Sequence, residues 1–112
     1  MGIYSKKTRL IKETMKNFNP KYEGYFMLQY CLDKLTEDFM KYSRKIMTVL
    51  FVETAEVFKT TIKAVERNIR YLMTHSGDKY KNYKLKDFLL ELSIELLVKL
   101  EGGKYKEDEQ KW

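Results

Sequence analysis

The chain has 112 residues, of which 44% are hydrophobic and 34% charged, and its net charge is +6. This length suits one domain with a single core, and the composition excludes a disordered chain. No apolar run approaches the roughly 18 residues that a membrane-spanning helix needs, and the N-terminus lacks the apolar segment of a signal peptide. The single cysteine, Cys31, excludes an internal disulfide and fits a reducing cytoplasm.

The excess positive charge is concentrated in one quarter of the chain. The segment from Lys59 to Lys86 carries eight of the 22 basic residues and two of the 16 acidic residues, so the rest holds fourteen of each and is neutral. A concentrated positive field favours a polyanionic partner such as nucleic acid. The alternative that charge alone leaves open is a lysine-rich surface that is only solvated.

Helical spacing of the apolar residues recurs along the chain. Five glycines and one proline indicate long helices joined by short connections. A first helix is predicted for about Ser5–Lys16, and the sequence around Pro20 ends it. A second is predicted for about Tyr22–Met40, with Cys31 as a small core residue, and a third for about Ile46–Phe58.

A fourth helix is predicted to begin near Thr61 and to have distinct inner and outer faces. At about 100° per residue, Lys63, Arg67 and Arg70 share the outer face, and Glu66 lies at its border. The inner face consists of Ile62, Val65, Ile69, Leu72 and Met73. This helix is therefore expected to pack on the core and to present cations outward.

The last helix is predicted for about Leu85–Glu101, after a loop in which Gly77 is suited to end the fourth helix. Its apolar residues cover more than one stripe, so it lies centrally in the core or shares its second face with another subunit. We expect the central position, with dimerisation as the alternative. Residues 102–112 are expected to form a frayed tail. The whole chain, residues 1–112, is thus predicted to be one all-α domain, a compact bundle of about five to six helices.

The third and fourth helices have the spacing of a helix-turn-helix over about residues 48–75. A small residue, Ala55, faces the second helix ten residues before Val65. The turn holds Lys59, where glycine or asparagine is usual because these residues tolerate a left-handed backbone. Many helical hairpins share this spacing, so it indicates the motif without proving it.

The outer face of the fourth helix, about residues 61–75, carries side chains that base recognition requires. In a helix-turn-helix, the second helix lies in the major groove with its N-terminal half against the base edges. An arginine such as Arg67 can bind guanine through two hydrogen bonds, and a carboxylate such as Glu66 can accept one from cytosine. In the alternative interpretation, Glu66 and Arg70 only form an ion pair one helical turn apart, worth about 0.3 kcal/mol.

The segment AEVFKTTIKAVERNIR resembles the recognition motif in the C-terminal DNA-binding domain of the stage-zero sporulation response regulators of endospore-forming bacteria. The matching residues are Ala55, Phe58, Thr60, Thr61, Val65, Glu66, Arg67, Ile69 and Arg70. GYFML, from Gly24 to Leu28, resembles the start of an early helix of that family. KDFLLELSIELLVKLE is similar to the closing helix of that family, with less specificity. The likeness therefore covers about residues 19–101. It follows an N-terminal helix within residues 1–18.

The resemblance implies an all-helical domain that binds short DNA boxes in promoters, often as dimers on repeated boxes. The expected base-reading residues are Lys63, Glu66 and Arg67, and the expected phosphate contacts are Lys59, Thr60, Thr61, Arg70, Lys81 and Lys84. Lys63 and Ala64 stand where the family usually has serine and arginine, which changes the expected target sequence and leaves the binding class unchanged. Tyr80 and Tyr83 are expected to pack against the domain.

The expected partner is double-stranded DNA, with a second copy of the chain and RNA polymerase as further candidates, in the cytoplasm of a bacterial cell at the nucleoid. Regulators of this family also have a receiver domain. About 18 residues precede the likeness, too few for such a domain, so the sequence indicates a free-standing or a shortened effector domain.

Enzyme chemistry has little support in the sequence. His75 is the only histidine, its spacing from Cys31 indicates no catalytic pair, and no phosphate-binding glycine loop is present. We expect no enzyme activity, no cofactor and no metal. The second function that stays open is a helical protein-interaction module or antagonist that keeps the fold and lacks specific DNA readout.

Overall fold

The structure is a computed structural model that describes residues 2–110 of the chain, with side chains described for residues 6–101. In this part of the chain the elements are α1 (Gly2–Thr14), α2 (Glu23–Glu37), α3 (Phe39–Ser43), the short π-helix η1 (Ile46–Leu50), α4 (Phe51–Val57), α5 (Ile62–Thr74) and α6 (Leu85–Gln110). No strand occurs among the described residues, and the predicted all-α bundle is confirmed.

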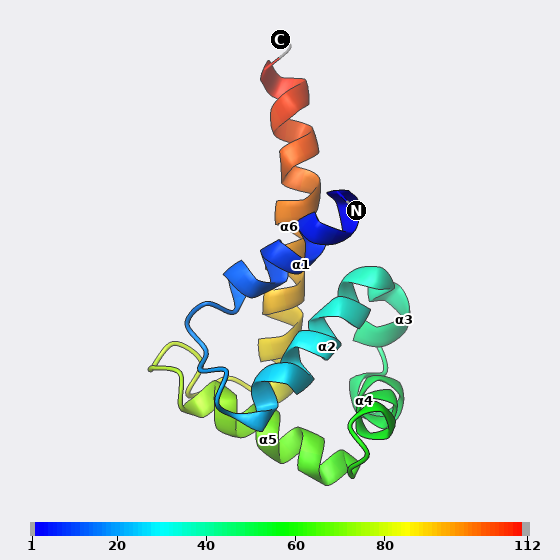
Figure 1. Cartoon of the computed structure of the whole chain (residues 1–112), viewed down its shortest axis with the longest axis vertical. Coiled ribbons are helices and arrows are strands. Elements are labelled where there is room, and N and C mark those ends of the chain that lie inside the picture. Colours follow the sequence, from blue (N-terminus) through cyan, green and yellow to red (C-terminus); the bar gives the residue numbers. More distant parts are fainter. Residues whose placement is uncertain (1, 111–112) are drawn as a thin grey trace.

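The helices are arranged around α2 and α6. Figure 1 shows α6 along the long axis of the molecule, with α1 crossing it and α5 lying across the end at which α6 begins. α2 contacts α1, α3, α4, α5 and α6, so it is the central element of the bundle. α5 is held mainly by α2 and α4, and it also contacts α6.

The hydrophobic core lies where α2, α5 and α6 meet. Leu28, Leu32 and Leu35 of α2 are fully buried, as are Phe88 and Leu89 of α6. Complete burial of one such side chain contributes about 1.5–3 kcal/mol to the transfer free energy that favours folding. α6 therefore occupies the predicted central position along its first half.

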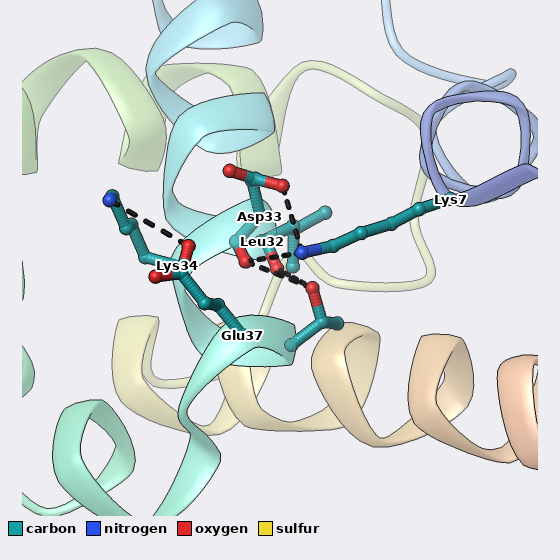
Figure 2. A network of polar contacts seen from close by, with 6 residues as sticks. Lys7, Leu32, Asp33, Lys34 and Glu37 are labelled. Carbon is teal, nitrogen blue, oxygen red and sulfur yellow. Dashed lines mark hydrogen bonds and ion pairs between the residues drawn. The ribbon is translucent and has the colours of Figure 1, made fainter. Parts of the chain in front are cut away.

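A polar contact joins α1 to α2. Lys7 Nζ donates to the backbone oxygen of Asp33 at 3.2 Å and lies 3.0 Å from its carboxylate Oδ1. Figure 2 shows this lysine extending from α1 to the C-terminal half of α2. A cation is favourable at this end of a helix, because the carbonyl groups there carry partial negative charge. The half-buried lysine thus helps to fix α1 over α2.

The predicted second helix, Tyr22–Met40, is wrong at its C-terminal end. α2 stops at Glu37, and Asp38 leaves the helical region with φ −146° and ψ 80°. The carboxylate of Asp38 accepts a hydrogen bond from the backbone N–H of Lys41 at 3.2 Å and caps the separate helix α3. Aspartate breaks a helix in this way because its short side chain can satisfy the free N–H groups of the next one.

Other helix boundaries also differ from the prediction. The first helix runs from Gly2 to Thr14 rather than over about 5–16. The third begins as η1, because the Lys45 carbonyl accepts from both Val49 and Leu50 and widens the turn. α6 ends at Gln110, so the predicted end at residue 101 is wrong. The two glycines directly after residue 101 each disfavour a helix by about 1 kcal/mol relative to alanine. The lysine and glutamate residues that follow them favour the helical conformation. Residues 111–112 of the predicted tail lie outside the described residues.

No helix among the described residues combines the length and the apolar character needed to cross a lipid bilayer.

α2 begins in direct contact with α5. A Cβ atom on Gly24 would overlap the backbone carbonyl of Asn68, so only glycine lets the two helices approach this closely. Beside it, Asn68 Nδ2 donates to Glu23 Oε2 at 3.2 Å. The first turn of α2 therefore sets the position of α5 relative to the rest of the bundle.

We predict that Gly24→Ala lowers the free energy of unfolding by about 1–3 kcal/mol, because the added methyl group must push α2 away from α5. Urea denaturation followed by circular dichroism measures the change. Lys21→Ala alters an exposed residue of the same connection and is the control, with an expected change below about 0.5 kcal/mol. Equal stability of Gly24→Ala and wild type would contradict the close contact.

Candidate nucleic-acid interface

α5 buries one face and exposes the other. Val65, Ile69, Leu72 and Met73 have exposed fractions of 1% or less and pack toward α2 and α4. Ile62 belongs to the predicted inner face but is 38% exposed, because it lies in the first turn at the edge of the bundle. The predicted division into an inner and an outer face is thus confirmed apart from Ile62.

The turn between α4 and α5 has a left-handed residue at its centre. Lys59 has φ +54°, the conformation for which glycine or asparagine is typical. The N–H of Thr60 donates to the Ala55 carbonyl at 2.9 Å and closes the C-terminal end of α4. A non-glycine residue in this region costs about 1–2 kcal/mol. The sharp reversal places α5 directly against α4, as a helix-turn-helix requires.

The second threonine of the turn caps α5. Thr61 is extended, with φ −101° and ψ 159°, and its Oγ1 accepts a hydrogen bond from the Ala64 N–H at 3.1 Å. Such a side chain satisfies one of the N–H groups that a helix leaves free at its start. The cap fixes the first turn of α5, which carries Lys63.

The outer face of α5 brings together four of the predicted DNA-contacting residues. They form one open hollow with two further residues of the same helix, and the six are Lys63, Glu66, Arg67, Arg70, Tyr71 and Thr74. Lys63 and Arg67 are exposed and have no ion-pair partner among residues 6–101. Tyr71 is not among the residues predicted from the sequence. Its position four residues after Arg67 is the signal that places it on the same side of the helix.

Glu66 and Arg70 form the ion pair of the alternative interpretation. Arg70 Nη2 lies 3.1 Å from Glu66 Oε1. The side chain of Glu66 is 35% exposed, and that of Arg70 is 49% exposed. An exposed pair one turn apart contributes about 0.3–0.5 kcal/mol, which a DNA contact can readily replace. Within the described residues only Oε1 of Glu66 is bonded, so its other oxygen can accept a hydrogen bond from a base.

The remaining predicted phosphate contacts lie at the two ends of α5. Lys59 and Thr60 are exposed in the turn before α5 and border a second hollow beside Phe26 and Phe58. Lys81 and Lys84 are exposed in the connection to α6, which Figure 1 shows beside the C-terminal end of α5, and neither lines the hollow of the outer face. Contact of these side chains with DNA stays a prediction.

The excess positive charge of the chain lies on one exposed segment. All eight basic side chains from Lys59 to Lys86 are exposed. The outward side of α6 carries instead the exposed acidic residues Asp87, Glu91, Glu95 and Glu101. The charge distribution therefore favours a polyanion around α5 over the acidic side of α6.

Packing of aromatic rings holds the loop that carries Lys81. Tyr80 is 8% exposed and contacts Phe88, with ring centroids 4.9 Å apart. Tyr83 donates from its hydroxyl to Glu91 Oε1 at 3.0 Å, a hydrogen bond that raises the pKa of Tyr83. The expectation that both tyrosines pack against the domain is confirmed.

Cys31 and His75 do not form a catalytic pair. Cys31 is fully buried with its sulfur 3.4 Å from the Thr54 hydroxyl, and burial raises the pKa of the Cys31 thiol to about 12. A thiol of this kind is not a thiolate nucleophile near neutral pH. His75 is exposed at the C-terminal end of α5. The described residues contain no cluster of three metal-ligating side chains.

Residues 9–96 match the protein family described as Sporulation initiation factor Spo0A C terminal. The chain belongs to this family. It is a family of DNA-binding domains of sporulation transcription factors, so DNA binding and transcription regulation are its general function. The match begins ten residues before the likeness predicted from the sequence and includes part of α1 and the whole helix-turn-helix. No curated protein and no solved structure matches the chain significantly.

We predict that Thr61→Ala lowers the free energy of unfolding by about 1 kcal/mol, because α5 loses its N-terminal cap. Thr60→Ala is the matched control: its side chain is exposed next to Thr61 and caps nothing among the described residues. Chemical denaturation of both variants measures the difference. Equal loss of stability in the two variants would show that the cap does not hold α5.

Proposed function

We propose that this chain binds specific double-stranded DNA by placing α5 in the major groove. The observation that carries the proposal is the outer face of α5, on which the cations lie exposed opposite an apolar face that is buried apart from Ile62. In a helix-turn-helix the N-terminal half of the second helix faces the base edges. Lys63, Glu66 and Arg67 occupy the first two turns of α5, the positions from which side chains reach bases.

Each of these side chains suits a particular base edge. Arg67 offers the forked donors that fit guanine O6 and N7, and Lys63 can donate to the same atoms. Glu66 can accept from the amino group of cytosine through the oxygen that Arg70 does not bind. These assignments give α5 a preference for G·C pairs in the part of the site that it contacts.

Phosphate contacts are assigned to both ends and one flank of α5. Lys59, Thr60 and Thr61 lie before its first turn, and Thr61 can donate its hydroxyl proton to phosphate while its oxygen caps the helix. Arg70 lies on the flank of the outer face, and Lys81 and Lys84 follow α5. Such contacts set the orientation of the domain on the duplex and carry no sequence information themselves.

We predict that Arg67→Ala weakens binding to the preferred DNA site by about 1–3 kcal/mol and relaxes selection at one base pair. Lys81→Ala, which is assigned to phosphate, should weaken all sequences alike and reduce the dependence of log affinity on log salt by about 0.9. Selection of bound sites from random duplexes, followed by titration at two salt concentrations, measures both effects.

Two results would contradict the readout. Affinity and sequence preference of Arg67→Ala equal to those of wild type would remove Arg67 from the base-reading set. Wild-type binding without steep salt dependence or sequence preference would support the alternative, a helical protein-interaction module that keeps the fold and lacks specific DNA readout.

We further propose that two copies bind side by side on repeated sites. α6 exposes Ile94 and Val98 on its outward side, by 49% and 61%, and these positions are one helical turn apart. Exposed apolar side chains at such spacing suit contact with another helix. A contact with RNA polymerase and a location at the bacterial nucleoid belong to the same proposal and stay predictions.

We predict that Val98→Glu abolishes cooperative binding to two adjacent sites and leaves affinity for a single site unchanged, because it places a charge in the contact between copies. Met40→Glu is the matched control, since Met40 is 62% exposed on α3 and lies outside α6. Gel-shift titrations on one-site and two-site duplexes measure cooperativity. Undiminished cooperativity in Val98→Glu would exclude this surface.

A further inference from the structure

The C-terminal end of α5 carries an ordered aromatic pair that base reading does not require. The rings of Tyr71 and His75 stack with centroids 3.7 Å apart and an angle of 17° between their planes. Tyr22, from the connection between α1 and α2, contacts both rings edgewise, at 5.2 Å and 6.4 Å between centroids. Tyr71 is nevertheless 46% exposed, and His75 is exposed as well. Two rings are therefore held in place and face solvent.

The pair lies on one flank of the outer face of α5. At about 100° per residue, Lys63 and Arg67 mark the middle of that face, Arg70 lies on one side and Tyr71 on the other. His75 follows Tyr71 by four positions, on the same side. A helix in the major groove meets bases with the middle of its face and the two sugar-phosphate backbones with its flanks. In this placement Arg70 faces one sugar-phosphate backbone of the duplex, and the flank that carries Tyr71 faces the other.

Hydrogen bonds determine which nitrogen of His75 is free. Nδ1 lies 2.9 Å from the Tyr71 carbonyl oxygen and 3.1 Å from the Thr74 hydroxyl. A carbonyl oxygen only accepts, so Nδ1 carries the proton and donates it to Tyr71. In the neutral ring, Nε2 then carries a lone pair and no proton. It can only accept a hydrogen bond, so it is repelled by a phosphate oxygen. In the imidazolium form Nε2 also donates and the ring carries positive charge.

The described contacts of His75 include no acidic group. The groups that face it are Tyr71 and Thr74 on α5 and Tyr22 from the preceding connection, and none of them is an acid. Within residues 6–101 no ion pair includes His75.

We propose that Tyr71 and His75 form a phosphate-binding element on the flank of α5 opposite Arg70, and that protonation of His75 strengthens DNA binding. The Tyr71 hydroxyl donates to the backbone at any pH near neutrality, and Nε2 of His75 donates only when the ring is protonated. This inference rests on the proposed function and adds a pH dependence to it. Histidine is the side chain whose charge changes between about pH 5 and 8, and His75 is the only one in the chain.

The test is the affinity of wild type, His75→Gln and Tyr71→Phe for a selected duplex at pH 6.0 and 8.0, each at several salt concentrations. Wild type should bind about threefold to tenfold more tightly at the lower pH, as one charge-assisted hydrogen bond provides. The slope of log affinity against log salt should steepen by about 0.9, the value for one further neutralised phosphate. Glutamine donates without titrating, so His75→Gln should lose both differences. Tyr71→Phe keeps the ring stack and should bind about twofold to fivefold more weakly at both pH values.

The outcomes separate this inference from the proposed function. If wild type shows no salt-dependent binding to the duplex at either pH, the proposed function fails. If wild type binds and His75→Gln keeps the wild-type ratio of affinities between the two pH values, the phosphate-binding element is refuted while the proposed function stands. Thermal unfolding at both pH values checks that His75→Gln is folded. If it is not, an unchanged wild-type salt slope between pH 6.0 and 8.0 overturns the inference by itself.

Discussion

The close contact between α2 and α5 is the constraint on which the candidate DNA-binding surface depends. Gly24 lets the backbones of the two helices approach to a distance that no Cβ atom would permit. Behind this contact, Val65 and Ile69 are completely buried. α5 is therefore held along its inner face by its contacts with α2 and α4. A helix fixed in this way can present its outer side chains in one orientation, which base recognition requires.

The forces on the outer face are weaker than those on the inner face, and this difference suits a DNA-binding surface. The Glu66–Arg70 pair contributes only a few tenths of a kcal/mol in water, so its partners can change when a duplex arrives. Lys63 and Arg67 have no internal ion pair to lose within the described residues. The acidic residues on α6 repel phosphate, so the charge distribution favours the approach of a duplex to α5 over the acidic side of α6.

The inner face of α5 was predictable from the spacing of apolar residues. Those residues are the ones that become buried, and in a helix they recur about every 3.6 positions in the sequence. Lys59 departs from the glycine or asparagine that is usual in the turn, and it adopts the left-handed conformation all the same. The break at Asp38 was missed because one local cap outweighed a helical pattern that continues on both sides of it. The contact of Gly24 with Asn68 and the edgewise contact of Tyr22 with Tyr71 depend on segments far apart in the chain, so spacing within one helix cannot predict them.

The central claim is that the outer face of α5 occupies the major groove with an arginine against guanine. Methylation of guanine N7 by dimethyl sulfate reports on that groove directly, because a bound donor shields N7 from the reagent. On the selected duplex, wild-type protein should protect one or more guanines, and Arg67→Ala, at concentrations that saturate the site, should leave one of them reactive. Guanines equally reactive in free and saturated duplex would contradict the placement of α5 in the groove.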